Sequence, residues 1–190
     1  MASTLSVQKI QGLATAADPT TVEIASGHKI TGAAGSIVAT GGIIQVVQGI
    51  YESQASSTSS SYVDTGLSVT ITPKFSTSKV LVTVDMMFSH APGYSGSNVR
   101  LVRDSTVIYY GAGTGHQSIH CGLVDGSQDW PCYRISAVYL DSPATASATV
   151  YKVQYQGQQS QYVGINRTQR VSATYDTAGA STITVMEVAQ

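Results

Sequence analysis

The strongest constraint on the fold is the spacing of the apolar residues, which alternate with polar ones along many short segments. No segment sustains the three-to-four-residue spacing of an amphipathic helix. Residue usage agrees, because Val, Ile and Thr number 55 of the 190 residues, whereas Leu, Lys and Glu together number 15. β-branched residues favour strands, and Leu, Lys and Glu favour helices. The chain is therefore predicted to be all-β.

The alternating segments give the positions of the expected strands. Asp104-Ser105 separates two of them as a hairpin turn, and Pro73 ends another. Lys79–Phe88 is the most apolar segment, which predicts a central position in a sheet. Ser53–Ser61 is expected to be a loop, and a long glycine-rich segment runs from Gly111 to Cys132. The expected strands are Ile44–Tyr51, Leu67–Ile71, Lys79–Phe88, Asn98–Arg103, Thr106–Tyr110, Tyr133–Leu140, Ala146–Gln156, Tyr162–Ile165 and Ser181–Val188.

This series of short strands separated by turns predicts an antiparallel β-sandwich, and we expect it to be jelly-roll-like. An immunoglobulin-like sandwich and a different Greek-key barrel are the alternatives. The chain lacks the Cys-Trp-Cys core triad of a true immunoglobulin domain, which argues against the first alternative.

Residues 1–42 differ from the rest of the chain. Their alternating segments are short, are separated by turn sequences such as Ser26-Gly27-His28, and contain only four charged residues. Such short strands do not bury a face alone, and intertwining with further copies would cover it. We therefore expect residues 1–42 to form a slender β-rich N-terminal arm, residues 43–190 to form a C-terminal sandwich head, and the chain to be homotrimeric.

Charge and hydropathy exclude two classes of partner. Ten basic and eleven acidic residues leave a net charge of -1, which argues against a general nucleic-acid binder because phosphate affinity needs clustered Lys and Arg. No apolar run approaches the roughly 20 residues of a membrane span, and the N-terminus shows no secretory signal. We expect neither nucleic-acid binding nor membrane insertion.

Several segments together resemble the tail fibre-like virion proteins of tailed bacteriophages, of the type found in marine and cyanobacterial phages. Their shared order along one chain carries more weight than any one of them. The glycine-rich segment Gly111–Cys132 has no counterpart in the resemblance. The segments that carry it are Ser3–Ile10, Val22–His28, Tyr62–Pro73, Ser76–Val82, Ile165–Arg167 and Ala180–Val188.

The resemblance implies a structural, non-enzymatic, homotrimeric virion protein. Its arm is expected to dock on other virion proteins, and its head to bind a glycan or protein of the host surface. A capsid decoration, head-fibre or collar protein that stabilises the particle is the alternative reading. A cellular module similar to lectins or C1q is a third.

The candidate receptor-binding residues are aromatic or basic side chains around the glycine-rich segment and one later loop. Aromatic rings stack on the apolar side of a sugar while amides and carboxylates bind its hydroxyls. Trp130 is the only tryptophan, and the alternative is that it plugs the end of the sandwich or a subunit interface. The candidates are Tyr109, Tyr110, His116, Trp130, Tyr133 and Arg167.

Two pairs of arginines are also notable, Arg100 with Arg103 and Arg167 with Arg170. Pairing with Asp residues across chains is the favoured reading, and contact with an anionic surface glycan is the other.

The two cysteines allow two interpretations. Cys121 and Cys132 bracket a turn-containing loop and could form a disulfide, or both could be free thiols. His116 and His120 beside Cys121 invite a zinc reading, but the spacing to Cys132 fits no zinc pattern. We expect no metal site.

No catalytic motif stands out in the sequence. There is no Gly-x-Ser-x-Gly elbow, no Walker or dinucleotide-binding glycine motif, and only three glutamates for paired-carboxylate chemistry. We therefore expect no enzymatic activity, no catalytic residues and no cofactor.

Overall fold

The computed structural model describes residues 26–27, 31–32, 37–91, 97–112, 117–119 and 132–190. Backbone contacts group Val38–Gln190 into one compact unit, to which the whole account below refers. Most of the predicted arm, residues 1–42, lies outside the described residues.

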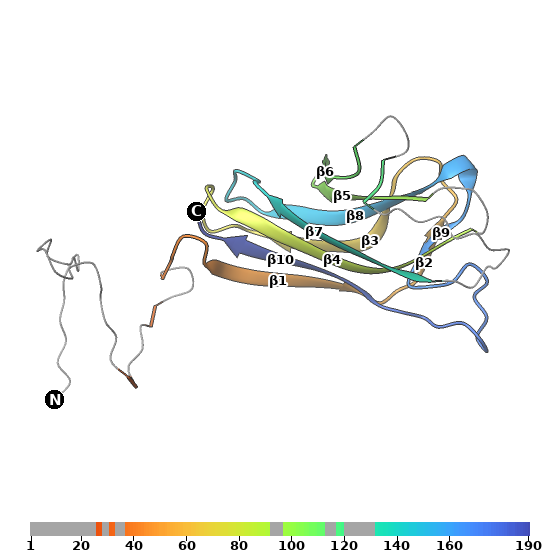
Figure 1. Ribbon diagram of the computed structural model, residues 1–190, viewed down its shortest axis with the longest axis horizontal. Coiled ribbons are helices and arrows are strands. Elements are labelled where there is room, and N and C mark those ends of the chain that lie inside the picture. Colours follow the sequence, from red (N-terminus) through yellow and green to blue (C-terminus); the bar gives the residue numbers. More distant parts are fainter. Residues whose placement is uncertain (1–25, 28–30, 33–36, 92–96, 113–116, 120–131) are drawn as a thin grey trace, which may run out of the picture. The chain divides into compact units, whose positions relative to one another are not determined.

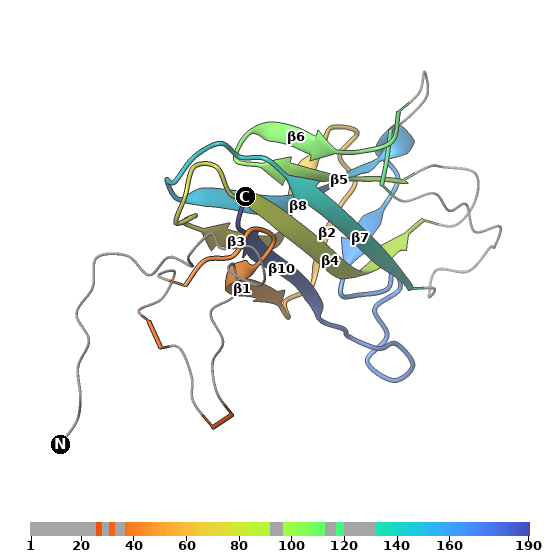
Figure 2. The ribbon, with the colours of Figure 1, turned by 60° about the vertical axis from the view of Figure 1, so that its left-hand side comes forward.

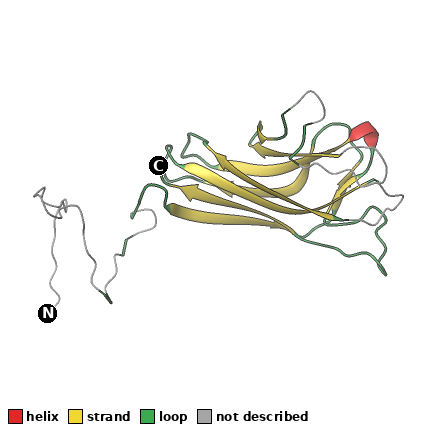
Figure 3. Ribbon diagram, in the orientation of Figure 1, coloured by secondary structure: helices red, strands yellow, loops and turns green. Residues whose placement is uncertain are grey.

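Antiparallel strands make up nearly all the regular structure of the described residues, and the one helical element there is a three-residue 3-10 turn, η1 (Gln158–Ser160) (Figures 1 and 3). The all-β prediction is confirmed. The strands are β1 (Ile43–Tyr51), β2 (Ala55–Ser57), β3 (Val63–Ile71), β4 (Lys79–His90), β5 (Ser97–Arg103), β6 (Thr106–Tyr109), β7 (Tyr133–Asp141), β8 (Thr149–Gly157), β9 (Val163–Ile165) and β10 (Ser181–Val188).

One local prediction is wrong in part, because the serine-rich run Ser53–Ser61 contains a strand. β2 pairs with β9 through Ala55 and Ile165. Its side chains are almost all hydroxyls, so it carries no apolar alternation that a sequence pattern could detect. Pairing with a partner distant in sequence decides its conformation.

The strands form two antiparallel sheets, which we name sheet A and sheet B. In sheet A, β1, β10, β4 and β7 lie side by side. β9 pairs with the last residues of β4, beyond the end of β10, and β2 pairs with β9. Figure 2 shows these four long strands in one layer. β4 pairs with β10 along one edge and with β7 along the other, which confirms its predicted central place. Sheet B has the order β3-β8-β5-β6.

The inward faces of the two sheets share one hydrophobic core. β4 contributes Met86 and Phe88 from sheet A, and β8 contributes Tyr151 and Tyr155 from sheet B, all at most 2% exposed. Alternate residues of these strands point inward, as the spacing predicted. Burial of a large apolar side chain contributes about 1.5–3 kcal/mol, so this layer supplies most of the stability. Two antiparallel sheets around a shared core are consistent with a β-sandwich.

A buried polar cluster links the two sheets near the end of β7. Asp141 of sheet A accepts hydrogen bonds from Arg103 (2.7 Å) and from the Tyr151 hydroxyl (2.7 Å), both of sheet B. Asp141 is 5% exposed, so these bonds replace its lost hydration. Burial and the bond to Asp141 raise the pKa of Tyr151 and keep its hydroxyl protonated as the donor.

The chain enters the sandwich beside the place where it ends. Gly41 donates to the Ala189 carbonyl (2.8 Å), and Ala189 donates back to the Gly42 carbonyl (2.9 Å). The residues that precede β10, 166–180, lie at its other end. β10 has eight residues, so about 25 Å separates the entry of the chain from this loop. The loop is seen at the end of the sandwich away from the C-terminus in Figure 1.

Candidate functional site

The segment 166–180 between β9 and β10, here called the β9–β10 loop, is anchored at its first residue. Asn166 is fully buried and has a left-handed backbone with φ of 59°. Its Nδ2 donates to the carbonyls of Tyr51 (2.6 Å) and Ser53 (3.0 Å), and its Oδ1 accepts from Ser181 (2.6 Å). Asn is the residue other than Gly that best tolerates this conformation. The side chain therefore fixes both ends of the loop to the end of β1.

Asp176 gives the middle of the loop its shape. Its carboxylate accepts from the Arg170 guanidinium at 2.5 and 3.1 Å and from the Ser172 backbone N–H at 2.5 Å. The hydrogen bonds from Arg170 and then from Ser172 lower the pKa of Asp176 to about 2. Asp176 is therefore a carboxylate at any physiological pH, and its charge is matched by Arg170.

The base of the loop is closed tightly. Gly179 donates to the Asn166 carbonyl at 3.2 Å. A Cβ atom at position 179 would collide with the sulfur of Met87 in β4, so any larger residue here requires the Met87 side chain to move. The loop thus packs against sheet A at Met87.

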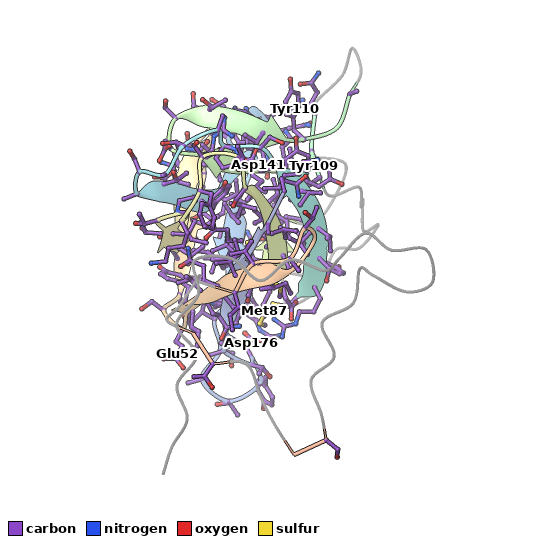
Figure 4. All side chains as sticks on the ribbon, turned by 90° about the vertical axis from the view of Figure 1, so that its left-hand side faces the viewer. Glu52, Met87, Tyr109, Tyr110, Asp141 and Asp176 are labelled. Carbon is purple, nitrogen blue, oxygen red and sulfur yellow. The ribbon has the colours of Figure 1, made fainter. Side chains whose placement is uncertain are left out.

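Two cavities flank the β9–β10 loop and share Thr168, Asp176 and Thr177. The larger, of about 430 Å³, lies between the loop and the start of β7. The smaller, of about 280 Å³, lies on the side of Gln54 and Arg167. The larger is bordered by Met87, Cys132, Thr168, Arg170, Tyr175 and Asp176. Figure 4 shows Met87 and Asp176 on the same side of the sandwich.

The lining of the larger cavity suits binding of a neutral, hydroxyl-bearing ligand. Tyr175 is 81% exposed and has the Arg170 guanidinium 6.0 Å from the centre of its ring, while Met87 supplies apolar surface. The ion pair of Arg170 and Asp176 offers donors and acceptors with no net charge. An aromatic face beside such groups is the usual composition of a sugar-binding site.

Two titratable groups of the larger cavity have shifted pKa values. Burial and then the charge of Asp176 raise the pKa of the Cys132 thiol, so it stays protonated. The thiol lies 3.3 Å from the Arg167 carbonyl, to which it donates. A raised thiol pKa disfavours a nucleophilic Cys132, and a lowered carboxyl pKa disfavours Asp176 as a general acid.

The structure separates the predicted receptor-binding residues into two groups. Tyr109 stacks on Tyr139 of β7, with ring centroids 5.1 Å apart, and Tyr110 beside it is 44% exposed. Tyr133 begins β7 six residues earlier, about 20 Å away along the strand. Figure 4 shows Tyr109 and Tyr110 on the side of the sandwich opposite Met87 and Asp176.

The second group adjoins the candidate site. Tyr133 stacks on the buried His90 (5.7 Å between centroids) and directly follows Cys132 of the larger cavity. Arg167 lines the smaller cavity and donates to the Thr168 carbonyl at 3.2 Å. His116 and Trp130 lie outside the described residues, and their predicted roles stay predictions. The same holds for the Cys121–Cys132 disulfide: Cys121 is not described, and Cys132 carries a free thiol.

Two of the arginines that were expected to pair with Asp residues across chains do so within the chain. Arg103 pairs with Asp141 and Arg170 pairs with Asp176. Arg100 donates to Gln154 at 2.8 Å and lies 3.8 Å from the centre of the Tyr62 ring. Sequence spacing gave no signal for these contacts. Asp141 and Gln154 come from other strands, Tyr62 precedes β3, and Asp176 is reached across a loop.

Tyr175, Asp176 and Met87 were not among the predicted site residues. Tyr175 and Asp176 fall in a segment whose apolar residues have no regular spacing. Sequence rules for such a segment do not predict that Arg170 pairs with Asp176 six residues later. Met87 looks like an ordinary outward residue of a central strand. The only available signal was an aromatic residue beside an acid in a polar loop, which is a weak one.

Within the described residues, no group of three His, Cys, Asp or Glu side chains is placed to hold a metal ion. His116, His120 and Cys121, which suggested zinc, are not described. Among the residues that are described, no helix has the length and apolar character needed to cross a membrane. No protein-family model matches the chain, and neither does any curated protein.

Proposed function

We propose that this chain is a non-enzymatic virion fibre protein whose sandwich head binds a host surface receptor. The resemblance of its sequence to phage tail fibre-like proteins supports this, and so does a surface built from hydroxyls and amides rather than charges. Its location is then the virion. Its partners are further copies of itself, other virion proteins and a receptor.

The observation that carries the proposal is the position of the larger cavity. It lies at the β9–β10 loop, at the end of the sandwich opposite the entry of the chain at Gly41. A fibre head needs this arrangement, with attachment through the N-terminal arm and recognition at the far tip. Loops held by a rigid scaffold are where binding residues concentrate.

The head is proposed to be a jelly roll. The order β1-β10-β4-β7 in one sheet and β3-β8-β5-β6 in the other supports this assignment. Consecutive strands repeatedly cross from one sheet to the other, as β2 to β3 and β4 to β5 do. Such crossings are what two Greek keys wound together produce.

The proposed ligand is a neutral saccharide of the host surface. Tyr175 supplies the stacking face, and Arg170, Asp176 and Thr168 supply donors and acceptors for hydroxyls. A single stacked ring contributes on the order of 1 kcal/mol, so each head is expected to bind weakly. Three heads on one fibre would raise the overall affinity by avidity.

The test uses a matched pair of tyrosine variants. Labelled Tyr175→Ala and Tyr110→Ala chains are applied to an array of bacterial surface polysaccharides and their component sugars. Both rings are exposed, so neither change should alter the fold. We expect Tyr175→Ala to weaken binding by roughly tenfold and Tyr110→Ala to leave it unchanged.

If Tyr110→Ala weakens binding and Tyr175→Ala leaves it unchanged, the binding site lies at Tyr109 and Tyr110. If wild-type chains bind nothing on the array or on host cells, the receptor-binding proposal is refuted.

A second candidate function is a capsid decoration, head-fibre or collar protein. The observation that favours it is the amount of exposed apolar surface on sheet A, where Val46 and Val138 are 57% and 64% exposed. Such a surface suits packing against other chains. Particles that lack the protein distinguish the two functions. Loss of adsorption supports the fibre, whereas fragile particles that still adsorb support decoration.

A further inference from the structure

The outward face of sheet A carries a continuous apolar strip. The register places Val46, Met186, Leu81 and Leu140 side by side across all four strands. Val138 stands in the next row, and Ile50 and Ile43 stand in the rows at either end of β1. Five of these seven residues are exposed, with Ile50 at 60% and Leu140 at 48%, while Met186 and Leu81 are half-buried. We call these seven residues the apolar face.

The opposite outward face, on sheet B, has a different character. There Asp64 accepts hydrogen bonds from Lys152 (2.8 Å) and Gln154 (2.7 Å), and Gln154 accepts from Arg100 (2.8 Å). This face is a charged and amide network suited to water. The outward faces of the two sheets therefore differ: sheet A exposes rows of apolar side chains, and sheet B exposes this polar network.

We infer that the apolar face is the surface through which copies of this chain pack against one another. The inference rests on the homotrimer of the proposed function and assigns its contact surface in the head. The next two observations, the size of the face and its charges, select a further copy of the chain as the occupant.

The size of the face suits a partner sheet better than a peptide. Four strands spaced 4.8 Å apart and about eight residues long span roughly 500 Å² in projection. A stable interface buries at least about 1,000 Å² in total. The occupant must therefore cover nearly the whole face with an equally broad surface, which the sheet A faces of the two neighbouring copies around a three-fold axis provide together.

The distribution of charge also matches a copy of the same face. The central rows, from Val46 to Leu140 and from Gln48 to Val138, carry no charge. The charged side chains lie toward the two ends. Lys79 stands at one, and Asp85 stands at the other, 3.4 Å from Arg134 within the same chain. A strongly charged partner would find no complement in the central rows, whereas the central rows of neighbouring copies meet without burying a charge.

The test places a charge on each outward face of the full chain. Leu140→Lys and Val46→Lys alter the apolar face, and Thr70→Lys adds the same charge to the exposed outward side of β3. Native mass is measured by light scattering after size exclusion. Wild type and Thr70→Lys are expected near three times 19.8 kDa. The two apolar-face variants are expected to shift to the mass of one chain, with unchanged circular dichroism.

If wild type is trimeric and the apolar-face variants stay trimeric, the inference is overturned and the proposed trimer stands. A monomeric wild type overturns both, and receptor binding is then judged by the Tyr175→Ala result alone. Carbene footprinting of wild type gives a second readout that needs no variant. Leu140 and Val138 should be protected at working concentration and become labelled on dilution. Full labelling of both at every concentration would overturn the inference.

Discussion

Replacing Asn166 with alanine should destabilise the head by about 3–4 kcal/mol. The side chain is fully buried and joins three segments. It contacts Tyr51 at the end of β1, Ser53 in the turn before β2, and Ser181 at the start of β10. The substitution removes all three hydrogen bonds. It also leaves alanine with a φ of 59°, which Asn tolerates better.

The magnitude follows from which groups lose a partner. The Tyr51 carbonyl loses a donor, and the buried Ser181 hydroxyl loses an acceptor. Each loss costs about 1–1.5 kcal/mol when water does not replace the partner. Ser53 is exposed, so water can take the place of its donor and little is lost. The left-handed backbone adds about 1 kcal/mol for alanine.

An Asn166→Asp variant separates the hydrogen bonds from the backbone term. Aspartate has the same shape and tolerates the same φ, but at neutral pH its second oxygen faces two carbonyl oxygens instead of donating to them. Its carboxyl pKa must therefore be raised in the folded state. A raised pKa means that the variant is most stable at low pH, where its carboxyl is protonated, and loses stability as the pH rises above the ordinary aspartate pKa of about 4.

The assay is urea unfolding at fixed protein concentration, because the stability of an oligomer depends on concentration. Circular dichroism follows the transition at pH 4 and pH 7. We expect the Asn166→Asp variant to lie closer to wild type at pH 4 than at pH 7, and the Asn166→Ala variant to show the same deficit at both. If both variants lie within 1 kcal/mol of wild type at pH 7, the side-chain bonds do not hold the loop and the argument fails.

Two other buried carboxylates give further predictions. Asp141→Ala should lower the free energy of unfolding by about 3–5 kcal/mol because Arg103 and Tyr151 lose their shared partner. Tyr151→Phe should lower it by only about 1.5–3 kcal/mol. Urea unfolding measures both, and equal losses would contradict a shared cluster. Burial alone would raise the pKa of Glu187, but hydrogen bonds from the Lys74 backbone and other donors outweigh it and lower the pKa. Its stabilisation is therefore present above its usual pKa of 4.5 and lost as pH falls below that value. A Glu187→Gln variant should lose less stability than wild type between pH 5 and pH 3, and parallel curves would refute this role.

Most of the strand framework could be predicted from the sequence because alternation records burial directly. Ser181–Val188 and the hairpin at Asp104-Ser105 are examples, with every second side chain buried or a turn at the polar pair. β2 escaped because its serines carry no apolar signal. The order of strands within the sheets also escaped, since it depends on pairings such as that of β1 with β10, more than 130 residues apart.

The candidate site could be predicted only in part for a similar reason. Arg167 and Tyr133 were selected for their chemistry, and both border the cavities at the β9–β10 loop or lie next to a residue that does. Tyr109 was selected on the same ground, but its ring stacks on Tyr139. Residue chemistry shows what a side chain can do, whereas its usefulness depends on whether another ring covers it. Tyr175, which is 81% exposed, had no distinguishing neighbour in sequence.

The proposed interface and the proposed binding site constrain each other through strand direction. If equivalent rows of the apolar face meet, sheet A must run in the same direction in every copy. The symmetry axis of the oligomer then lies along the strands of sheet A. All β9–β10 loops then lie at the same end, and all chain entries at Gly41 lie at the other. Antiparallel packing would bring Lys79 of one copy to Asp85 of the next, and would place the cavities at opposite ends. A weak site gains avidity only when its copies face the same surface. Parallel packing is therefore the arrangement in which an uncharged apolar face and a weak saccharide site at the tip act together.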